Sequence, residues 1–157
     1  MLQKKSLRDW DVAFPRRRDL YTILFAFPGL LLTGLTISLV SPMFTGTPAD
    51  TGIGAPATFS GWLVMLLSCV STGYLEESFF RFYLLNKLGE LGVKTGTAVF
   101  VSVVFFALCH VYEGPWGVLN AVLAGTLLAL LFLQYRSLHG IALAHGFYNT
   151  FVYALGV

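Results

Sequence analysis

The sequence predicts an all-α integral membrane protein with five transmembrane helices, on three observations. The chain has 157 residues, of which 56% are hydrophobic and 11% charged, against roughly 25% charged in soluble proteins. Half of its charged residues lie within residues 1–19, so the remainder lacks the polar residues that would cover a soluble protein. That remainder divides into five apolar runs separated by short polar segments.

The composition also excludes several classes of protein. A chain this hydrophobic does not stay disordered, and two cysteines are too few for a secreted disulfide scaffold. Beyond the N-terminal tail no basic face exists that could bind nucleic acid. The expected surroundings of the chain are lipids and other membrane proteins.

The first apolar run covers residues 20–41 and follows a basic tail, residues 1–19. At about 1.5 Å per residue this run can cross a hydrocarbon core of roughly 30 Å. It exceeds the apolar region of a signal peptide, typically about 7–15 residues, so we expect an uncleaved first span. Residues 20–157 are expected to form a single transmembrane domain.

Four further spans follow a loop at residues 42–59, which is rich in Gly, Pro and Thr. They are predicted near residues 60–87, 96–112, 116–135 and 138–157.

The basic residues predict the orientation of the spans. Nine of the ten Lys and Arg residues fall on one side of this arrangement, in the tail, in the loop with Lys87 and Lys94, and at Arg136. The positive-inside rule then places the N-terminus in the cytoplasm and the C-terminus outside. With no organelle signal in the sequence, we expect a multi-pass protein of a prokaryotic cytoplasmic membrane.

Small residues recur every fourth position in the fourth predicted span, which favours close approach of another helix. They are Gly117, Ala121, Gly125 and Ala129.

Five ionisable residues lie within the spans: Glu76, Glu77, Arg81, His110 and His145. A charged residue at the centre of a membrane helix costs about 2.5–3.5 kcal/mol on insertion scales. Such residues are therefore expected to face the interior of the bundle and to have partners there.

The spacing predicts different tasks for the two glutamates. Glu77 and Arg81 are four residues apart and share a helix face, as an ion pair requires. Glu76 points about 100° away from that face, so it cannot pair with Arg81. A carboxylate without an ion-pair partner suits a general base. His145 and Asn149 also share a face, and the rise along the helices puts Glu76, His110, His145 and Asn149 within about two helical turns of one level.

Three segments together resemble the motifs of one family. Residues 76–81 resemble E-E-x-x-x-R, residues 106–110 resemble F-x-x-x-H, and residues 145–149 resemble H-x-x-x-N. These are the motifs, in the same order, of the CPBP intramembrane glutamic proteases, also called the CAAX-protease, bacteriocin-processing or Abi family. The resemblance covers roughly residues 60–157.

The resemblance implies a catalytic four-helix core formed by spans two to five. It implies that Glu76 activates a water, that His110 binds and orients this water, and that His145 with Asn149 polarises the scissile carbonyl. Glu77 and Arg81 would hold the site together, and Phe106 would wall it. No cofactor and no metal is implied.

The implied activity is hydrolysis of a peptide bond in a membrane-embedded or membrane-anchored protein or peptide. A prenylated C-terminus, a leader or bacteriocin-like peptide and the sorting tail of a surface protein all fit this description.

Three alternatives stay open. A non-catalytic scaffold or peptide-binding protein could use the same polar residues to join helices. A cysteine mechanism would use Cys69 or Cys109 with a histidine, and a zinc site would use the same Glu and His residues, although no H-E-x-x-H is present. We expect His139 to be solvated in a cytoplasmic turn and Glu113 to be a loop charge.

Overall fold

The computed structural model describes residues 16–45 and 54–156, and these residues form helices and turns without any strand. The predicted all-helical fold class is confirmed for this part of the chain. The expectations for residues 1–15 and for the loop around Asp50 lie outside the described residues.

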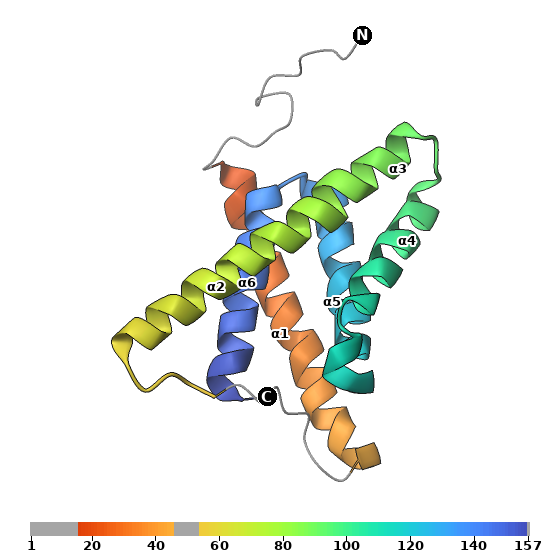
Figure 1. Ribbon diagram of the computed structural model, residues 1–157. Coiled ribbons are helices and arrows are strands. Elements are labelled where there is room, and N and C mark those ends of the chain that lie inside the picture. Colours follow the sequence, from red (N-terminus) through yellow and green to blue (C-terminus); the bar gives the residue numbers. More distant parts are fainter. Residues whose placement is uncertain (1–15, 46–53, 157) are drawn as a thin grey trace.

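The described residues contain five helices, one for each predicted span. In chain order the elements are α1 (Arg17–Thr45), α2 (Phe59–Glu77), the π-helix η1 (Ser78–Leu85), α3 (Asn86–Glu90), α4 (Thr95–Leu108), the 3₁₀ turn η2 (Val111–Glu113), α5 (Gly114–Tyr135) and α6 (Leu138–Leu155) (Figure 1). The elements α2, η1 and α3 form one continuous helix.

Three of these helices are long and apolar enough to cross a membrane: Arg17–Thr45, Phe59–Glu90 and Val111–Tyr135. With 14 residues, α4 is shorter than the roughly 20 residues that a perpendicular span needs. The number of membrane crossings therefore stays a prediction.

The helix α4 ends at Leu108, four residues before the predicted end of the third span. The turn that follows is closed by Glu113, whose N–H donates to the carbonyl of His110 at 3.0 Å. Gly114 then takes a φ of 77°, a conformation that favours glycine, and Pro115 lies in the first turn of α5. His110 therefore lies in a turn at the end of α4, outside the helix itself.

Helices α2 and α6 cross with their backbones almost in contact. A Cβ atom on Gly73 would lie 2.6 Å from the carbonyl oxygen of Ala142, and one on Gly146 would lie 2.6 Å from Cα of Val70. Glycine at both positions allows this approach. The crossing fixes how residues a few positions further along α2 meet residues of α6.

The remaining helices pack around this crossing. α6 also packs against α1, and α5 packs against α1 and α4. In Figure 1 the continuous helix from α2 to α3 runs diagonally across the other helices.

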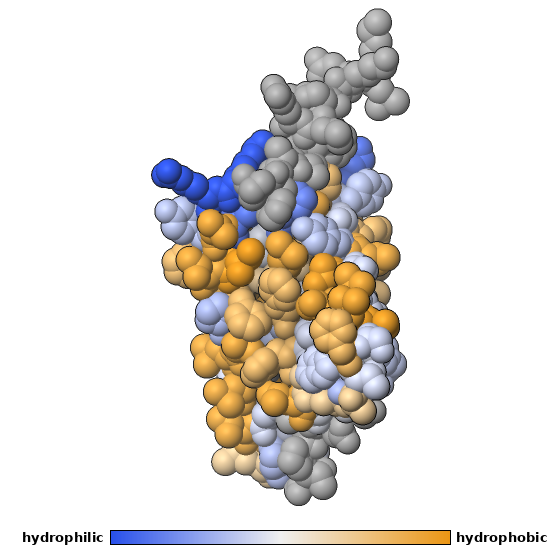
Figure 2. Space-filling view, turned by 90° about the vertical axis from the view of Figure 1, so that its left-hand side faces the viewer, coloured by the Kyte–Doolittle hydropathy of each residue, from blue (hydrophilic) through white to orange (hydrophobic). Residues whose placement is uncertain are grey.

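Exposed basic residues gather at one end of the molecule. Arg17, Lys87, Lys94 and Arg136 are exposed, and the helix ends that carry them lie together at the top of Figure 1. Figure 2 shows hydrophilic residues at this end and mostly hydrophobic residues along the rest of the face. We call this the basic end, and the opposite end, with the α4–α5 turn and the end of α6, the far end.

Asp19 joins the first turns of α1 and α6. It is 2% exposed and accepts hydrogen bonds from the N–H of Arg16 at 2.7 Å and from Oγ of Ser137 at 2.5 Å. Ser137 Oγ in turn accepts from the N–H of Gly140 at 2.9 Å, as an N-cap residue does. Asp19, the last residue of the predicted tail, is buried because the first turn of α1 packs against Ser137 and Gly140 at the start of α6.

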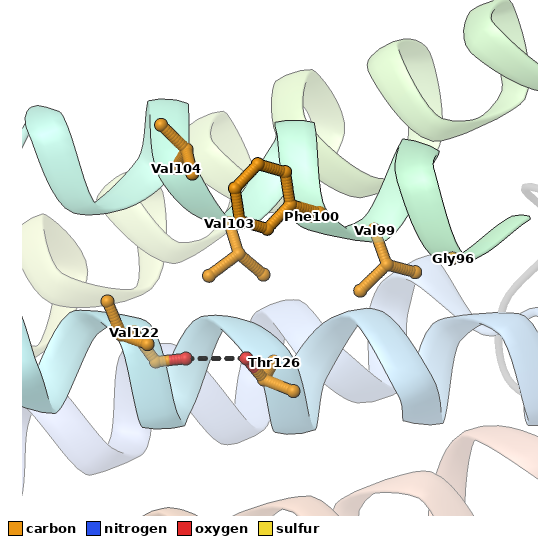
Figure 3. Close-up of a pocket in the computed structure, with 7 residues that line it drawn as sticks. All are labelled: Gly96, Val99, Phe100, Val103, Val104, Val122 and Thr126. Atoms are coloured by element: carbon orange, nitrogen blue, oxygen red, sulfur yellow. Dashed lines mark hydrogen bonds between the residues drawn. The ribbon is translucent and has the colours of Figure 1, made fainter. Parts of the chain in front are cut away.

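An apolar groove of about 370 Å³ lies between α4 and α5 (Figure 3). It is lined by Gly96, Val99, Phe100, Val103, Val104, Val122 and Thr126. The hydroxyl of Thr126 donates to the carbonyl of Val122 at 2.7 Å. The lining contains no titratable side chain, so the groove carries none of the predicted chemistry.

Candidate active site

Glu77 and Arg81 form a buried ion pair, as their spacing predicts. Both side chains are fully buried, and Nη1 of Arg81 lies 2.9 Å from Oε1 of Glu77. Nη2 of Arg81 donates to the carbonyl of Gly125 at 3.1 Å, and the guanidinium lies 4.2 Å from the centre of the Phe106 ring. Removing one member of such a pair leaves an uncompensated buried charge.

Gly125 leaves room for this arrangement. A Cβ atom at this position would lie 3.0 Å from Cδ1 of Phe106 and 3.2 Å from Nη2 of Arg81. At this point of α5 the predicted stripe of small residues receives two side chains of the site rather than the backbone of another helix.

The helix changes from α to π geometry directly after Glu77. The π-helix η1 covers Ser78–Leu85, and π segments inside helices are often found at functional sites. The carbonyl of Phe80, within this segment, accepts a hydrogen bond at 2.9 Å from Oγ of Ser102, a fully buried residue of α4. Ser102 thus holds the segment between Glu77 and Arg81 against α4.

His145 lies between the two glutamates. Its Nδ1 is 2.9 Å from Oε1 of Glu77, and its Nε2 is 3.7 Å from Oε2 of Glu76. Because the Glu77 carboxylate is paired with Arg81 and only accepts hydrogen bonds, we assign the donating proton to Nδ1. The second nitrogen of the ring then faces Glu76.

Glu76 has surroundings that differ from those of Glu77. Its side chain is 18% exposed, whereas Glu77 is fully buried. Oε2 of Glu76 is a buried atom without a hydrogen-bond partner among the described residues. The adjacent carboxylates thus diverge as the helix geometry predicts. Oε2 of Glu77 also lacks a hydrogen-bond partner among the described residues, so the two carboxylates differ in the ion pair with Arg81 and in exposure.

His110 approaches the same site from the turn after α4. Its Nδ1 lies 2.8 Å from the carbonyl of Phe106, and because a carbonyl only accepts, this nitrogen carries the proton. In the neutral ring Nε2 is then an acceptor.

Phe106 forms the wall between these groups. It is 1% exposed, and its ring centre lies 4.5 Å from that of His110 and 6.0 Å from that of His145. With Arg81 against it as well, Phe106 keeps the two histidines and the guanidinium apart.

Asn149 is half-buried and lies one helical turn beyond His145 on α6. No side-chain hydrogen bond joins it to another residue of the described chain. The neighbouring Tyr148 behaves differently, because it is buried and its hydroxyl accepts a hydrogen bond at 3.1 Å from Nδ2 of Asn120 on α5. The side-chain amide of Asn149 is therefore free to bind another group, whereas that of Asn120 joins α5 to α6 through Tyr148.

The structure corrects the expectation for His139. This residue is half-buried in the first turn of α6, and its Nδ1 lies 2.9 Å from Oη of Tyr74 on α2. The prediction treated the turn before α6 as solvated, but the α2–α6 crossing brings Tyr74 over it. The presence of a tyrosine within an apolar span could have predicted such a contact, because a buried hydroxyl usually forms a hydrogen bond.

The two cysteines are free thiols, Cys69 buried and Cys109 exposed. Among the described residues, neither thiol has a hydrogen bond to a histidine that could activate it. Within residues 16–45 and 54–156, no group of three or more His, Cys, Asp and Glu side chains is arranged to hold a metal ion.

Comparison with known proteins identifies the family. The family model described as type II CAAX prenyl endopeptidase Rce1-like matches residues 58–151. This segment is more than half of the chain, begins at the N-cap of α2 and contains all three motifs. The chain belongs to this family. The resemblance drawn from the motifs is thereby confirmed, and α1 lies outside the matched segment.

Neither the curated proteins nor the solved structures gave a significant match. Membership in the Rce1-like family makes the chain a member of a CAAX-type protease family. Together with the three apolar helices, it also makes the chain a membrane protein.

Proposed function

We propose that this Rce1-like protein is an intramembrane endopeptidase in which Glu76 activates a water molecule. The observation that carries the proposal is the contrast between neighbouring carboxylates. Both carboxylates have an Oε2 atom without a hydrogen-bond partner among the described residues, but Glu77 is fully buried and neutralised by Arg81 at 2.9 Å, whereas Glu76 is 18% exposed and lies 3.7 Å from Nε2 of His145. A positioned carboxylate beside an imidazole suits general base catalysis.

In the first step the water gives a proton to Oε2 of Glu76 as its oxygen bonds to the scissile carbonyl carbon. Nε2 of His110 accepts a hydrogen bond from the second proton of the water and orients its lone pair. Phe106 maintains this geometry because it fixes His110 through the carbonyl at 2.8 Å.

The carbonyl oxygen then becomes an oxyanion, which needs hydrogen-bond donors. Asn149 supplies an amide N–H, and His145 in its doubly protonated form supplies Nε2–H while Nδ1–H remains on Glu77. Because Glu76 is protonated at this stage, the Glu77 carboxylate, the Arg81 guanidinium and the His145 imidazolium together carry one positive charge, which balances the oxyanion. Glu76 finally passes its proton to the leaving nitrogen, the C–N bond breaks, and no covalent acyl-enzyme forms.

The proposed arrangement in the membrane has five crossings, with the N-terminus in the cytoplasm and the C-terminus outside. The clustering of Arg17, Lys87, Lys94 and Arg136 at one end supports it. Residues 20–157 form one transmembrane domain behind the basic tail, with a catalytic core of α2, α4, α5 and α6. The proposed location is a prokaryotic cytoplasmic membrane.

The proposed substrate is a membrane-embedded or membrane-anchored protein or peptide, such as a prenylated tail, a leader peptide or a sorting tail. A proteomic comparison of cells with the wild-type chain and cells with Glu76→Gln would reveal it as an uncleaved membrane peptide. The matched control is Glu90→Gln, because Glu90 is an exposed carboxylate of the same continuous helix that pairs with Lys87. Cells with this control should process the peptide as the wild type does.

The scaffold alternative predicts a different result. If the cellular phenotype and the peptide pattern survive both Glu76→Gln and His110→Ala while each variant still inserts, the protein binds its partner without cleaving it.

A further inference from the structure

On the side of the site nearer the basic end, each of the three helices that build it has buried residues next to the site. Glu77 and Arg81 on the α2–η1 helix are fully buried, Phe106 on α4 is 1% exposed, and Ile141 and Ala144 on α6 are fully buried. A peptide coming from the basic end would have to separate the buried ion pair and displace the Phe106 ring, which is costly in a bundle of low dielectric constant.

On the side nearer the far end, the same helices carry polar residues that are partly exposed. On α6, Asn149 and Tyr153 follow His145 at intervals of four residues and are half-buried. After α4, His110 is half-buried and Tyr112 is 80% exposed, with their rings stacked at 6.4 Å. One wall of the site therefore continues from α6 and the other from the α4–α5 turn.

Glu113 follows Tyr112 in the same 3₁₀ turn. Glu113 is also tied to the site through its N–H bond to the carbonyl of His110 at 3.0 Å. Partly exposed polar residues thus continue from the site toward the far end on both α6 and the α4–α5 turn.

We propose that the active site opens at the far end, so that water and substrate reach Glu76 from the outer face of the membrane. This inference rests on the proposed function and on the proposed orientation. The substrate class is then an exported polypeptide whose scissile segment lies beside the outer leaflet, such as the membrane-anchored tail of a surface protein. A tail that is displayed only in the cytoplasm would meet the buried side of the site, nearer the basic end.

The test is cysteine labelling of the full chain in its own membrane. In a background of Cys69→Ala and Cys109→Ser, single cysteines are introduced as Tyr112→Cys at the opening, Asn149→Cys at the site and Lys87→Cys at the basic end. A membrane-impermeant maleimide is then added to intact cells and, separately, to inverted membrane vesicles. The readout does not require cleavage, so the test can fail independently of Glu76→Gln.

The expected result is labelling of Tyr112→Cys and Asn149→Cys in intact cells and of Lys87→Cys only in inverted vesicles. Tyr153→Cys serves as a second probe of the opening should Tyr112→Cys not insert. Labelling of Asn149→Cys only in inverted vesicles, or in neither preparation, would overturn the proposal. So would labelling of Tyr112→Cys and Lys87→Cys from the same side.

Discussion

Glu76 and Glu77 are adjacent in the chain, yet they belong to two regions of the site with opposite properties. Glu77 lies with Arg81, Phe106 and Ser102, and each of these four residues is at most 1% exposed. Glu76 lies with His110 and Asn149 in a region that is partly exposed. We propose that the paired carboxylate maintains the structure and that the more exposed one takes part in the chemistry.

Exchanging each glutamate for glutamine tests this division most strongly. Glu76→Gln removes the general base and should lower the cleavage rate by about 10³-fold or more, with the free energy of unfolding in detergent nearly unchanged. Glu77→Gln leaves Arg81 as a buried unpaired charge and should lower the free energy of unfolding by about 3–5 kcal/mol.

Cleavage rates and denaturation curves of both variants provide the measurement. Equal loss of stability in the two variants would mean that the two carboxylates have the same role, and the comparison would fail.

The two asparagines allow a sharper version of the comparison. Asn149→Ala removes the proposed oxyanion donor and should lower the cleavage rate by about 10²–10³-fold with little change in thermal stability. Asn120→Ala breaks the hydrogen bond to Tyr148 and should instead cost about 1 kcal/mol of stability at nearly wild-type rate. A rate loss for Asn120→Ala as large as that for Asn149→Ala would show that the assignment of the two amides is reversed.

Gly125→Ala probes the supporting region without changing any charge. The added Cβ would crowd Phe106 and Arg81 at 3.0 and 3.2 Å, and overpacking of this kind typically costs about 1–3 kcal/mol. The matched control is Gly89→Ala, because a Cβ there meets nothing within 4 Å. Thermal unfolding of the two variants should differ, and a Gly125→Ala protein as stable as the control would contradict the packing described.

Ser102→Ala should have a smaller effect. It removes the hydrogen bond to the Phe80 carbonyl at 2.9 Å, which should cost about 1 kcal/mol of stability. Ser102→Thr keeps the hydroxyl and should restore part of that loss if the added methyl group fits, as a denaturation series can measure.

Removal of metal ions should have no effect on the cleavage rate, because Glu76 is proposed to activate the water without one. The measurement is the rate after dialysis against a chelator, with a zinc peptidase treated in parallel. A rate that falls and returns on addition of zinc would favour the zinc alternative.

The sequence was sufficient to predict the helices and the motifs. Long apolar runs reveal helices because the backbone must satisfy its hydrogen bonds within each span, and the spacing of Glu77 and Arg81 predicts their ion pair. The end of α4 was placed too late, since hydropathy continues through Val111 and Tyr112 while the backbone already turns before Gly114.

Contacts between helices could not be predicted in the same way. The placement of His145 between both glutamates depends on the α2–α6 crossing at Gly73 and Gly146, which no spacing within one helix encodes. The hydrogen bond from Ser102 to η1 and the pairing of Tyr74 with His139 are similar cases. The sequence around each of these residues does not indicate which residue of another helix it will contact.

The helix α1 lies outside the family match, but it is part of the same core. Ala26 and Leu30 are fully buried, Asp19 holds Ser137, and a Cβ on Gly34 would lie 2.6 Å from Oη of Tyr148. Residues 58–151 alone would therefore expose the surfaces of α5 and α6 that α1 covers. The segment that matches the family is therefore shorter than the part of the chain that packs as one unit. A truncation to the matched segment would remove a helix that belongs to the core.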